Sequence, residues 1–369
     1  MKDFLKVYDV TIKVCGPVFI GNGQEINKKE YIFLPRQHKV LIPKLSSMYD
    51  YLKKKRLDHE YERYMMKENR MNLSEWIKQQ GISEKDIMEW TEYSMDCGDA
   101  IWERGRQMEM RAFIKDVYGC PYIPGSSIKG MLRTILLAYD IQMNPNRYNV
   151  VKSDVLNNIR QRANRNIYLK RETKKIEEIA FNKGKRTDRA ADMVNDIMAG
   201  IIVSDSKPLS VNDLTLCQKI EYHVDGTEKR LNLLRECLKP GTEVHFNISI
   251  DESVCRISIQ DIENAIRAFN KQYYKMFSGK FPNVYEPEDN TVWLGGGTGY
   301  VSKTIIYNMF GKQGLKIIPQ IYQNTNVPRE HGHMKDEGLG VSPHILKKTK
   351  YNGKDYQFGE CVIFFSEKG

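Results

Sequence analysis

The sequence predicts an α+β fold made of two small α+β units. Strand-like and helix-like segments occur in two β-rich blocks, and long polar insertions interrupt those blocks. Hydrophobic residues make up 41% of the chain, which is enough to bury a substantial core. At 369 residues the chain is long for one compact domain and sufficient for two.

The first block is predicted over residues 1–140. It opens with an alternating segment rich in β-branched side chains, which is typical of a strand with one buried face. The elements predicted in this block are strands at 4–14, 30–34 and 39–42, a polar loop at 21–30, a helix at 45–55, a helical insertion at about 57–105 and a helix that contains residues 128–139. The last of these helices carries apolar residues at three- and four-residue spacing, so it should face a core.

A basic insertion is predicted over residues 141–200 and a second block over residues 201–369. Within the insertion, residues 160–189 contain eleven Lys or Arg and four Asp or Glu, and we expect an irregular or hairpin excursion there. The second block is predicted to contain strands at 201–203, 214–224, 233–238, 244–250 and 360–365, a helix at 261–277, a glycine-rich turn at 294–299 that leads into another helix, and otherwise loop in the last fifty residues. Both blocks are compatible with split β-α-β, ferredoxin-like units.

Charge and cysteine usage narrow the functional class. The chain has 57 Lys and Arg against 47 Asp and Glu, a formal charge of +10, which favours a polyanionic partner. The seven cysteines are scattered without a Cys-x-x-Cys pair, so we expect reduced thiols rather than disulfides or a zinc site. No apolar run of about 18 residues or secretory signal is present, which predicts a cytoplasmic protein without a membrane span.

The first candidate binding site is the segment at 122–133, which opens the helix that contains residues 128–139. Ser126 or Ser127 is expected to cap this helix, whose first N–H groups lack intrahelical partners. Lys129 and Arg133 are four residues apart on one flank, where like charges slightly destabilise a helix. A bound phosphate would compensate for both features, so we predict that these four residues and Gly125 bind a nucleic-acid backbone. The alternative is a solvated basic flank.

The second candidate site is a glycine-rich turn followed by a lysine. It contains Gly295, Gly296, Gly297, Thr298, Gly299 and, four residues later, Lys303. Glycines let a backbone approach a phosphate closely, and successive N–H groups can surround an anion. The segment also approximates a P-loop, although Ser302 stands where the second glycine belongs. We therefore predict a phosphodiester clamp, with nucleotide hydrolysis and a purely structural turn as alternatives.

Acid–base catalysis is a rival hypothesis. Glu25 and Glu30 lie in the early polar loop and His38 follows it, so these three residues could serve an endoribonuclease that matures or cleaves RNA. Without a paired base or a metal constellation, a solvated loop is favoured.

Two further groups of side chains could bind a metal or stack on bases, and ordinary structural roles are the alternatives. His331 and His333, close to Asp336, lack a third ligand at suitable spacing, so a surface loop and no metal are expected. Tyr168 and Phe181 lie within the basic stretch, where they could stack on unpaired bases.

The chain resembles the RAMP proteins, the RNA-binding subunits of type III CRISPR effectors. The resemblance rests on the sequence Pro-Gly-Ser-Ser-Ile-Lys-Gly at 124–130 and Gly-Gly-Gly-Thr-Gly at 295–299, in that order, and on the opening strand that runs into Phe-Ile-Gly-Asn-Gly at 19–23. A fainter copy, Ile-Pro-Lys-Leu-Ser-Ser at 42–47, precedes the helical insertion. This arrangement is similar to that of the capping subunits, subunit five, of type III-A (Csm) complexes.

The resemblance implies RRM-like or ferredoxin-like RAMP domains and a capping position at the crRNA 3′ end. It further implies crRNA, target RNA and other Csm-complex subunits as partners, chiefly the adjacent backbone RAMP subunit, and a role in crRNA maturation and antiviral interference. Repeating backbone subunits of this family cleave target RNA with an aspartate in the early loop, and this chain has no aspartate between Asp9 and Asp50. We therefore expect a non-catalytic subunit without a cofactor, whose two glycine-containing turns form one RNA-binding groove.

Overall fold

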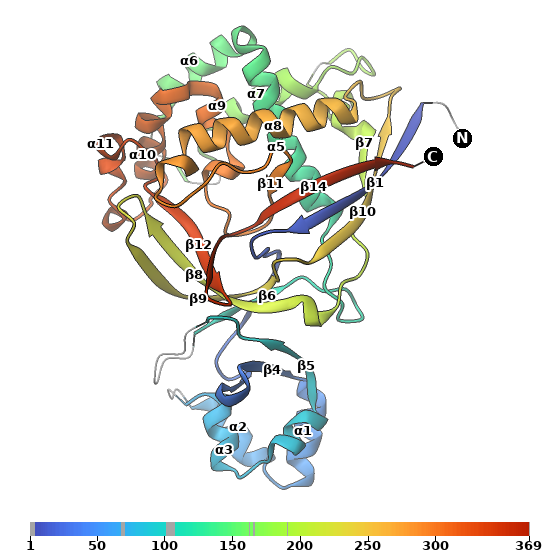
Figure 1. Ribbon diagram of the computed structural model, residues 1–369, viewed down its shortest axis with the longest axis vertical. Coiled ribbons are helices and arrows are strands. Elements are labelled where there is room, and N and C mark those ends of the chain that lie inside the picture. The colour runs from blue at the N-terminus through green and yellow to red at the C-terminus, as the bar shows by residue number, and fades with distance from the viewer. Residues whose placement is uncertain are drawn as a thin grey trace.

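The computed structural model describes residues 4–67, 71–100, 108–161, 163–164, 167–189 and 191–368. A large upper body contains most of the strands and helices, and a smaller helical lobe projects below it (Figure 1). The predicted α+β class is confirmed by this mixture of sheets and helices. No helix in the described ranges is both long and apolar enough to span a bilayer.

A five-stranded antiparallel sheet with two long helices forms one half of the body. Its strands, in spatial order, are β11 (Thr291–Trp293), β14 (Glu360–Glu367), β1 (Leu5–Val14), β10 (Glu243–Asp251) and β7 (Ile201–Val203). The helices α5 (Gly125–Met143) and α8 (Ile259–Met276) pack on each other above the sheet (Figure 1). The chain order β1-α5-β7-β10-α8-β14 and the strand order β14-β1-β10-β7 are those of a ferredoxin-like fold.

A second, branched sheet lies below the first. The path β2-β6-β9-β8-β5-β4-β3 runs through it, and β12 pairs with both β8 and β13. The strands are β2 (Gly21–Ile26), β3 (Ile32–Leu34), β4 (Lys39–Pro43), β5 (Thr91–Asp96), β6 (Met110–Phe113), β8 (Leu214–His223), β9 (Glu228–Leu238), β12 (Ile345–Tyr351) and β13 (Lys354–Gln357). Its longest strands, β8 and β9, form the floor on which the glycine-rich loop lies.

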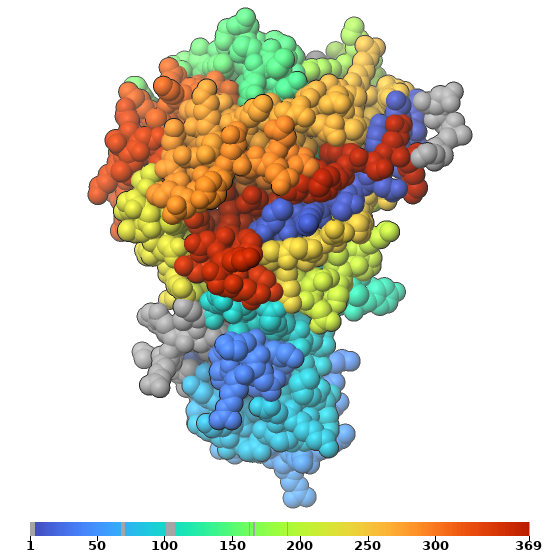
Figure 2. Space-filling view, viewed as in Figure 1, coloured from blue at the N-terminus to red at the C-terminus, as the bar shows by residue number. Residues whose placement is uncertain are grey.

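The remaining helices are short and lie outside the sheets. The lobe, which projects from the body in Figure 2, contains α1 (Leu45–Lys54), α2 (Asp58–Met66), α3 (Leu73–Gln79) and α4 (Glu84–Glu89). It has a hydrophobic cluster of its own. The upper body carries α6 (Asn149–Asn158), α7 (Lys170–Phe181), α9 (Ile306–Phe310), α10 (Gly314–Asn324) and α11 (Asp336–Leu339). Single 3-10 turns occur at Pro35–Gln37, Pro145–Tyr148, Met193–Asn195, Ile197–Gly200, Val211–Asp213, Ser278–Lys280, Val301–Lys303, Gly311–Gln313, Arg329–His331 and His333–Lys335.

Several predicted elements are corrected by the structure. The basic stretch contains the helix α7 rather than an irregular excursion, because Ile176 and Ala180 recur at four-residue spacing and are buried. The polar loop at 21–30 begins with the strand β2, whose first five residues are exposed and therefore carry no apolar signal. The end of the chain adds the hairpin β12–β13, and the helical stretch ends at Glu89, followed by β5. Residues 101–107 of the predicted insertion lie outside the described residues.

Each sheet takes strands from both ends of the chain. β1 lies between β10 and β14, and β6 pairs with β9. The division of the chain into domains at residues 140 and 200 stays a prediction. The two sheets do not correspond to the first and second predicted domains, because each sheet contains strands from both.

Candidate nucleic-acid interface

The start of α5 is tightly packed on the strand β7. A Cβ atom at Gly125 would lie 2.4 Å from the carbonyl oxygen of Val203, so only glycine fits there. Its N–H donates to Asp205 Oδ1 at 2.7 Å, so a carboxylate accepts from the first N–H group of the helix. The N-cap residue is Pro124, and the side chain that accepts from the first N–H of the helix belongs to Asp205, so the prediction that Ser126 or Ser127 caps the helix is wrong.

Arg133 is committed to packing inside the protein. Its Nη2 lies 2.8 Å from Glu177 Oε2, its Nη1 lies 2.8 Å from Asp196 Oδ2, and its guanidinium lies 4.3 Å above the Phe181 ring. The predicted role of Arg133 in RNA binding is therefore corrected: the side chain fastens α7 and the segment before β7 to α5. Phe181 is buried beneath it, which removes this ring from the residues that could stack on bases.

The first turn of α5 keeps two other predicted residues near the surface. Ser126 is exposed, and Lys129 is half-buried. Desolvation lowers the pKa of Lys129, and the charge of Arg133 lowers it further, against the opposing effect of Asp196. A cation in such a position gains from an approaching anion.

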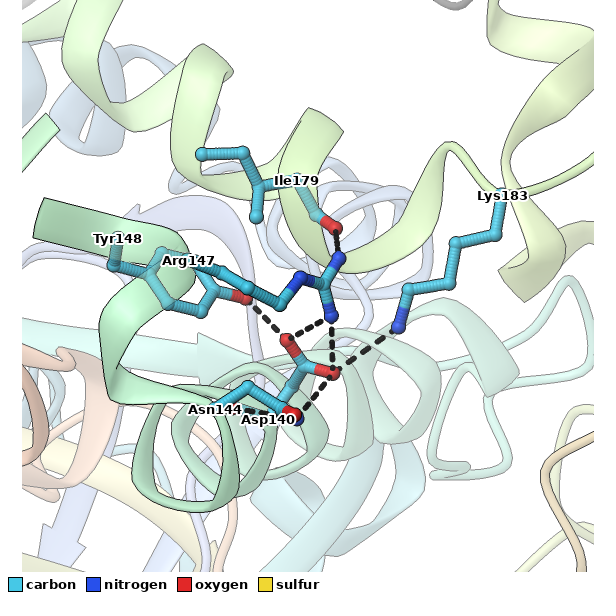
Figure 3. Close-up of polar contacts among 6 residues, drawn as sticks. All are labelled: Asp140, Asn144, Arg147, Tyr148, Ile179 and Lys183. Carbon is cyan, nitrogen blue, oxygen red and sulfur yellow. Dashed lines mark hydrogen bonds and ion pairs between the residues drawn. The ribbon is translucent and has the colours of Figure 1, made fainter. Parts of the chain in front are cut away.

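Other basic residues in and near the basic stretch also form ion pairs with a carboxylate of this chain. Figure 3 shows Asp140, near the C-terminal end of α5, with Lys183 and Arg147 directed at its carboxylate. Lys183 Nζ lies 3.1 Å from Asp140 Oδ1, Arg147 Nη1 lies 3.4 Å from Asp140 Oδ2, and the Tyr148 hydroxyl donates to Asp140 Oδ2. Arg147 also donates to the carbonyl of Ile179, so this cluster attaches α7 to α5. Part of the basic surplus is thus structural.

The glycine-rich loop makes a sharp excursion that glycine alone permits. Gly295, Gly297 and Gly299 have φ of +84°, +97° and +96°. A Cβ atom at Gly295 would lie 2.2 Å from the carbonyl oxygen of Phe19, and the Gly296 N–H donates to that oxygen at 2.6 Å. The loop is therefore held against the segment after β1 in a fixed conformation.

Two hydroxyls hold the loop from inside. Thr298 is buried and donates to the carbonyl of Gly295 at 3.3 Å, and the Ser302 hydroxyl donates to the carbonyl of Thr298 at 3.1 Å. Only the 3-10 turn Val301–Lys303 follows the loop, where a P-loop would begin a long helix. The nucleotide-hydrolysis alternative is therefore unsupported by this geometry.

Arg235 lies directly beneath this loop. The residue is only 6% exposed, and a Cβ atom at Gly297 would lie 2.6 Å from its Nη1. The guanidinium lies between two aromatic rings, 5.1 Å from the centroid of Phe19 and 5.6 Å from that of Phe358. Within the described part of the chain its Nε and Nη1 have no hydrogen-bond partner. Burial lowers its pKa, as expected for a cation without a counter-ion.

Two lysines bring further positive charge to the same place. Desolvation, followed by the charges of Lys347 and Arg235, lowers the pKa of Lys219 to about 8. Desolvation and Arg235 also lower the pKa of Lys303, whose side chain is exposed just after the loop. Among the described residues, neither lysine forms an ion pair. Lys219, Arg235 and Lys303 are called the loop cations below.

The carboxylates near the loop cations form ion pairs with other basic residues. Glu221 Oε1 lies 2.7 Å from Lys347 Nζ, and Glu25 Oε1 lies 3.2 Å from Arg111 Nη2. Both of those cations lower the pKa of Lys219. The loop cations are therefore in excess over the nearby negative charge, and an anion would relieve their mutual repulsion.

The two predicted turns do not form one groove. The turn at Gly125 packs on residues that follow β7, whereas the glycine-rich loop follows β11. β7 and β11 are opposite edges of the five-stranded sheet, and four strand spacings amount to about 19 Å. The predicted common groove is therefore wrong. Residues that follow the two turns do share a cavity: Thr134 of α5 and Lys303, which follows the glycine-rich loop, both line a cavity of about 350 Å³.

The residues of the catalytic rival are each engaged locally. Glu25 pairs with Arg111, and Glu30 accepts the Asn27 N–H at 2.8 Å. His38 has φ of +50° and closes the turn between β3 and β4. These contacts show no shared acid–base arrangement of the three side chains.

Lys219 and Arg235 were missed from the sequence. They occur inside the two longest strands, where charged residues ordinarily point to solvent. In the sequence, Arg235 and Glu236 stand out only as two charged residues within an otherwise apolar run. The structure shows that both of these residues are buried.

Relatives of this chain carry one name. The chain is 29% identical to a Mycobacterium tuberculosis protein named CRISPR system Cms protein Csm5, with 98% of each chain covered. Proteins of the same name from Streptococcus thermophilus and Enterococcus italicus are each 27% identical, covering 83% and 99% of this chain and 82% and 99% of their own lengths.

Solved structures share the fold. A chain from the structure titled "Cryo-EM structure of Csm-crRNA-target RNA ternary complex in type III-A CRISPR-Cas system" aligns with a TM-score of 0.67 at 18% identity, covering 97% of this chain and 100% of that one. The crystal structure of Csm5 from T. onnurineus aligns with a TM-score of 0.60 at 17% identity, covering 95% and 99%. The prediction of RAMP-type, ferredoxin-like architecture is confirmed by these likenesses together with the strand order described above. The family model described as RAMP superfamily matches residues 11–302, and the chain belongs to that superfamily.

Proposed function

We propose that this chain is a non-catalytic RNA-binding subunit of a type III-A CRISPR effector, capping the crRNA 3′ end in the cytoplasm. Its relatives are named as Csm5 of CRISPR systems, and they align over nearly the whole chain. The partners proposed are crRNA, target RNA and other Csm-complex subunits, chiefly the adjacent backbone RAMP subunit. The role proposed is support of crRNA maturation and antiviral interference, without a cofactor.

The loop cations carry this proposal. Three positive groups gather around the glycine-rich loop. Within the described ranges two of them lack ion pairs, and the third is a buried guanidinium with two unpaired nitrogens. A sugar-phosphate backbone supplies the missing negative charge and does not require base-specific contacts. We propose that residues 295–299, Lys303, Lys219 and Arg235 hold the guide backbone. The residues Gly125, Ser126, Ser127 and Lys129 would make a separate contact at the start of α5.

A charge-removing double substitution tests the interface. Lys219→Ala with Lys303→Ala should weaken binding of single-stranded RNA equally for unrelated sequences. Two lost phosphate contacts should reduce the slope of log affinity against log salt by about 1.4. Fluorescence anisotropy at several salt concentrations measures both quantities.

A matched control carries the same charge loss in the lobe. Lys53 and Lys54 are exposed at the end of α1, and the double variant Lys53→Ala, Lys54→Ala should leave the slope unchanged. An equal loss in both double variants, or a loss confined to one RNA sequence, would contradict the proposed backbone contact.

The non-catalytic assignment is tested with the purified chain and labelled crRNA precursor. With or without Mg²⁺, the RNA should remain intact, because Glu25 pairs with Arg111, Glu30 accepts the Asn27 N–H and His38 closes a turn. Cleavage that disappears in Glu30→Ala would establish the endoribonuclease alternative instead.

A further inference from the structure

Four of the chain's seven histidines gather beside the second sheet. They come from β8, from the two 3-10 turns before α11 and from the segment before β12, and they are His223, His331, His333 and His344. The ring centroids of His333 and His344 are 5.1 Å apart, those of His223 and His344 are 5.6 Å apart, and those of His331 and His333 are 6.0 Å apart. Only the His-x-His pair is visible in the sequence, because His344 comes from a different segment.

A buried carboxylate lies at the centre of this group. Asp336 is fully buried, and its Oδ1 lies 2.5 Å from His344 Nδ1 while its Oδ2 lies 3.3 Å from His333 Nδ1. The Ser342 hydroxyl donates to Oδ2 at 2.6 Å. Both carboxylate oxygens are thus held by neighbouring side chains in the protein interior.

We propose that His333, Asp336 and His344 bind one transition-metal dication of the Zn²⁺ class. One ligand atom from each residue lies within 4.8 Å of those of the other two. Two imidazoles and one carboxylate are a donor set typical of zinc with a fourth position open to water or another ligand. A dication also neutralises the buried carboxylate, and both histidine side chains are only 12% exposed.

The surroundings orient this donor set. The Ser342 hydroxyl fixes one carboxylate oxygen, as outer-shell groups do at metal centres. The Tyr322 ring packs 4.4 Å from the His333 ring and limits its rotation. The ion would fasten α11 to the beginning of β12, which pairs with β8, the strand that carries Lys219. The metal would thus fix the strand pairing beside the RNA interface without itself contacting RNA.

Metal titration of the full-length, metal-free chain tests the site without RNA. We expect one Co²⁺ or Zn²⁺ per chain, with the visible absorption of four-coordinate cobalt and no thiolate-to-cobalt bands. His333→Ala and His344→Ala should each lower the affinity at least about tenfold. His59→Ala is the control, because His59 is exposed on α2 and should leave metal binding unchanged.

Two further readouts keep the proposal testable if a variant folds poorly. Zinc should raise the melting temperature of the wild-type chain and of His59→Ala, because an ion that binds only the folded state stabilises it. X-ray absorption of the zinc-loaded wild-type chain should show nitrogen and oxygen neighbours at about 2.0–2.2 Å and no sulfur at about 2.3 Å. Absence of stoichiometric binding to the wild-type chain, sulfur ligation, or full affinity in both histidine variants would overturn the site and leave a hydrogen-bonded cluster only. None of these outcomes bears on the loop cations.

Discussion

Lys219 shows how one residue can reduce stability while serving a binding surface. Its pKa of about 8 means that the folded state holds this proton less tightly than the unfolded chain, in which a lysine has its ordinary pKa of 10.5. Between pH 8 and 10.5 the unfolded chain binds more protons, so stability rises with pH in that window. Below about pH 8 both states are protonated and the full electrostatic cost is present.

The first prediction follows from this titration. RNA phosphates should raise the pKa of Lys219, so affinity should be constant below about pH 8 and fall as the pH rises toward 10.5. Lys219→Met should remove this pH dependence and bind RNA more weakly at pH 7. The same variant should be more stable to urea at pH 7, by about 1 kcal/mol, because a desolvated charge is lost. Anisotropy across pH and urea titrations measure these effects, and an unchanged pH profile in the variant would argue against Lys219 as a contact.

At the same scale, the sequence indicated the glycines and Lys303 but not the other two loop cations, Lys219 and Arg235. Gly295, Gly297 and Gly299 announce a tight loop because few other residues adopt positive φ. Arg235 gives no such signal, because its depth depends on Phe19 and Phe358, which lie 216 positions before it and 123 after it. The tight turn of the loop was predictable from its glycines, whereas the burial of Arg235 beneath it depends on the fold.

Among the elements, α5 is the helix on which the basic stretch is assembled. The Arg133 ion pairs hold α7 and the segment before β7, and the Asp140 cluster holds α7 near its other end. The sequence predicted α5 and α8 well, because long apolar stripes at helical spacing are a strong signal. It missed α7 as a helix because charge along the stretch outweighed its short buried stripe.

Arg133 therefore yields a prediction about packing and not about RNA. Arg133→Met should lower the free energy of unfolding by about 2 kcal/mol, because Glu177 and Asp196 lose their partner and the contact with Phe181 changes. The salt slope of RNA binding should stay as in the wild-type chain. Arg171→Met is the matched control, since Arg171 is exposed on α7. A reduced salt slope in Arg133→Met would restore the residue to the interface.

For the whole molecule, antiparallel pairing joins segments that are far apart in the sequence. β1 and β14 pair directly, and the Lys368 N–H donates to the carbonyl of Val7 at 2.9 Å, so the first and last strands lie side by side (Figure 1). Alternating patterns identify strands such as β1 and β10, but they do not specify partners, because any strand with a matching apolar face is suitable. The architecture was therefore predictable as a class, and the interleaving of the two sheets was not.

Two separate hydrophobic clusters lead to a prediction at this largest scale. Ile363 of β14 belongs to the main core, opposite Ile12, whereas Trp76 of α3 belongs to the cluster of the helical lobe. Each side chain is buried, so Ile363→Ala and Trp76→Ala should each cost about 2–5 kcal/mol in the unit that contains it. Hydrogen exchange should accelerate across β1, β10 and α8 in the first variant, and only over the lobe helices in the second. Because the loop cations belong to the body, Trp76→Ala should keep its RNA affinity while Ile363→Ala loses affinity in proportion to the unfolded fraction. Identical exchange profiles in the two variants would show that lobe and body unfold as one cooperative unit.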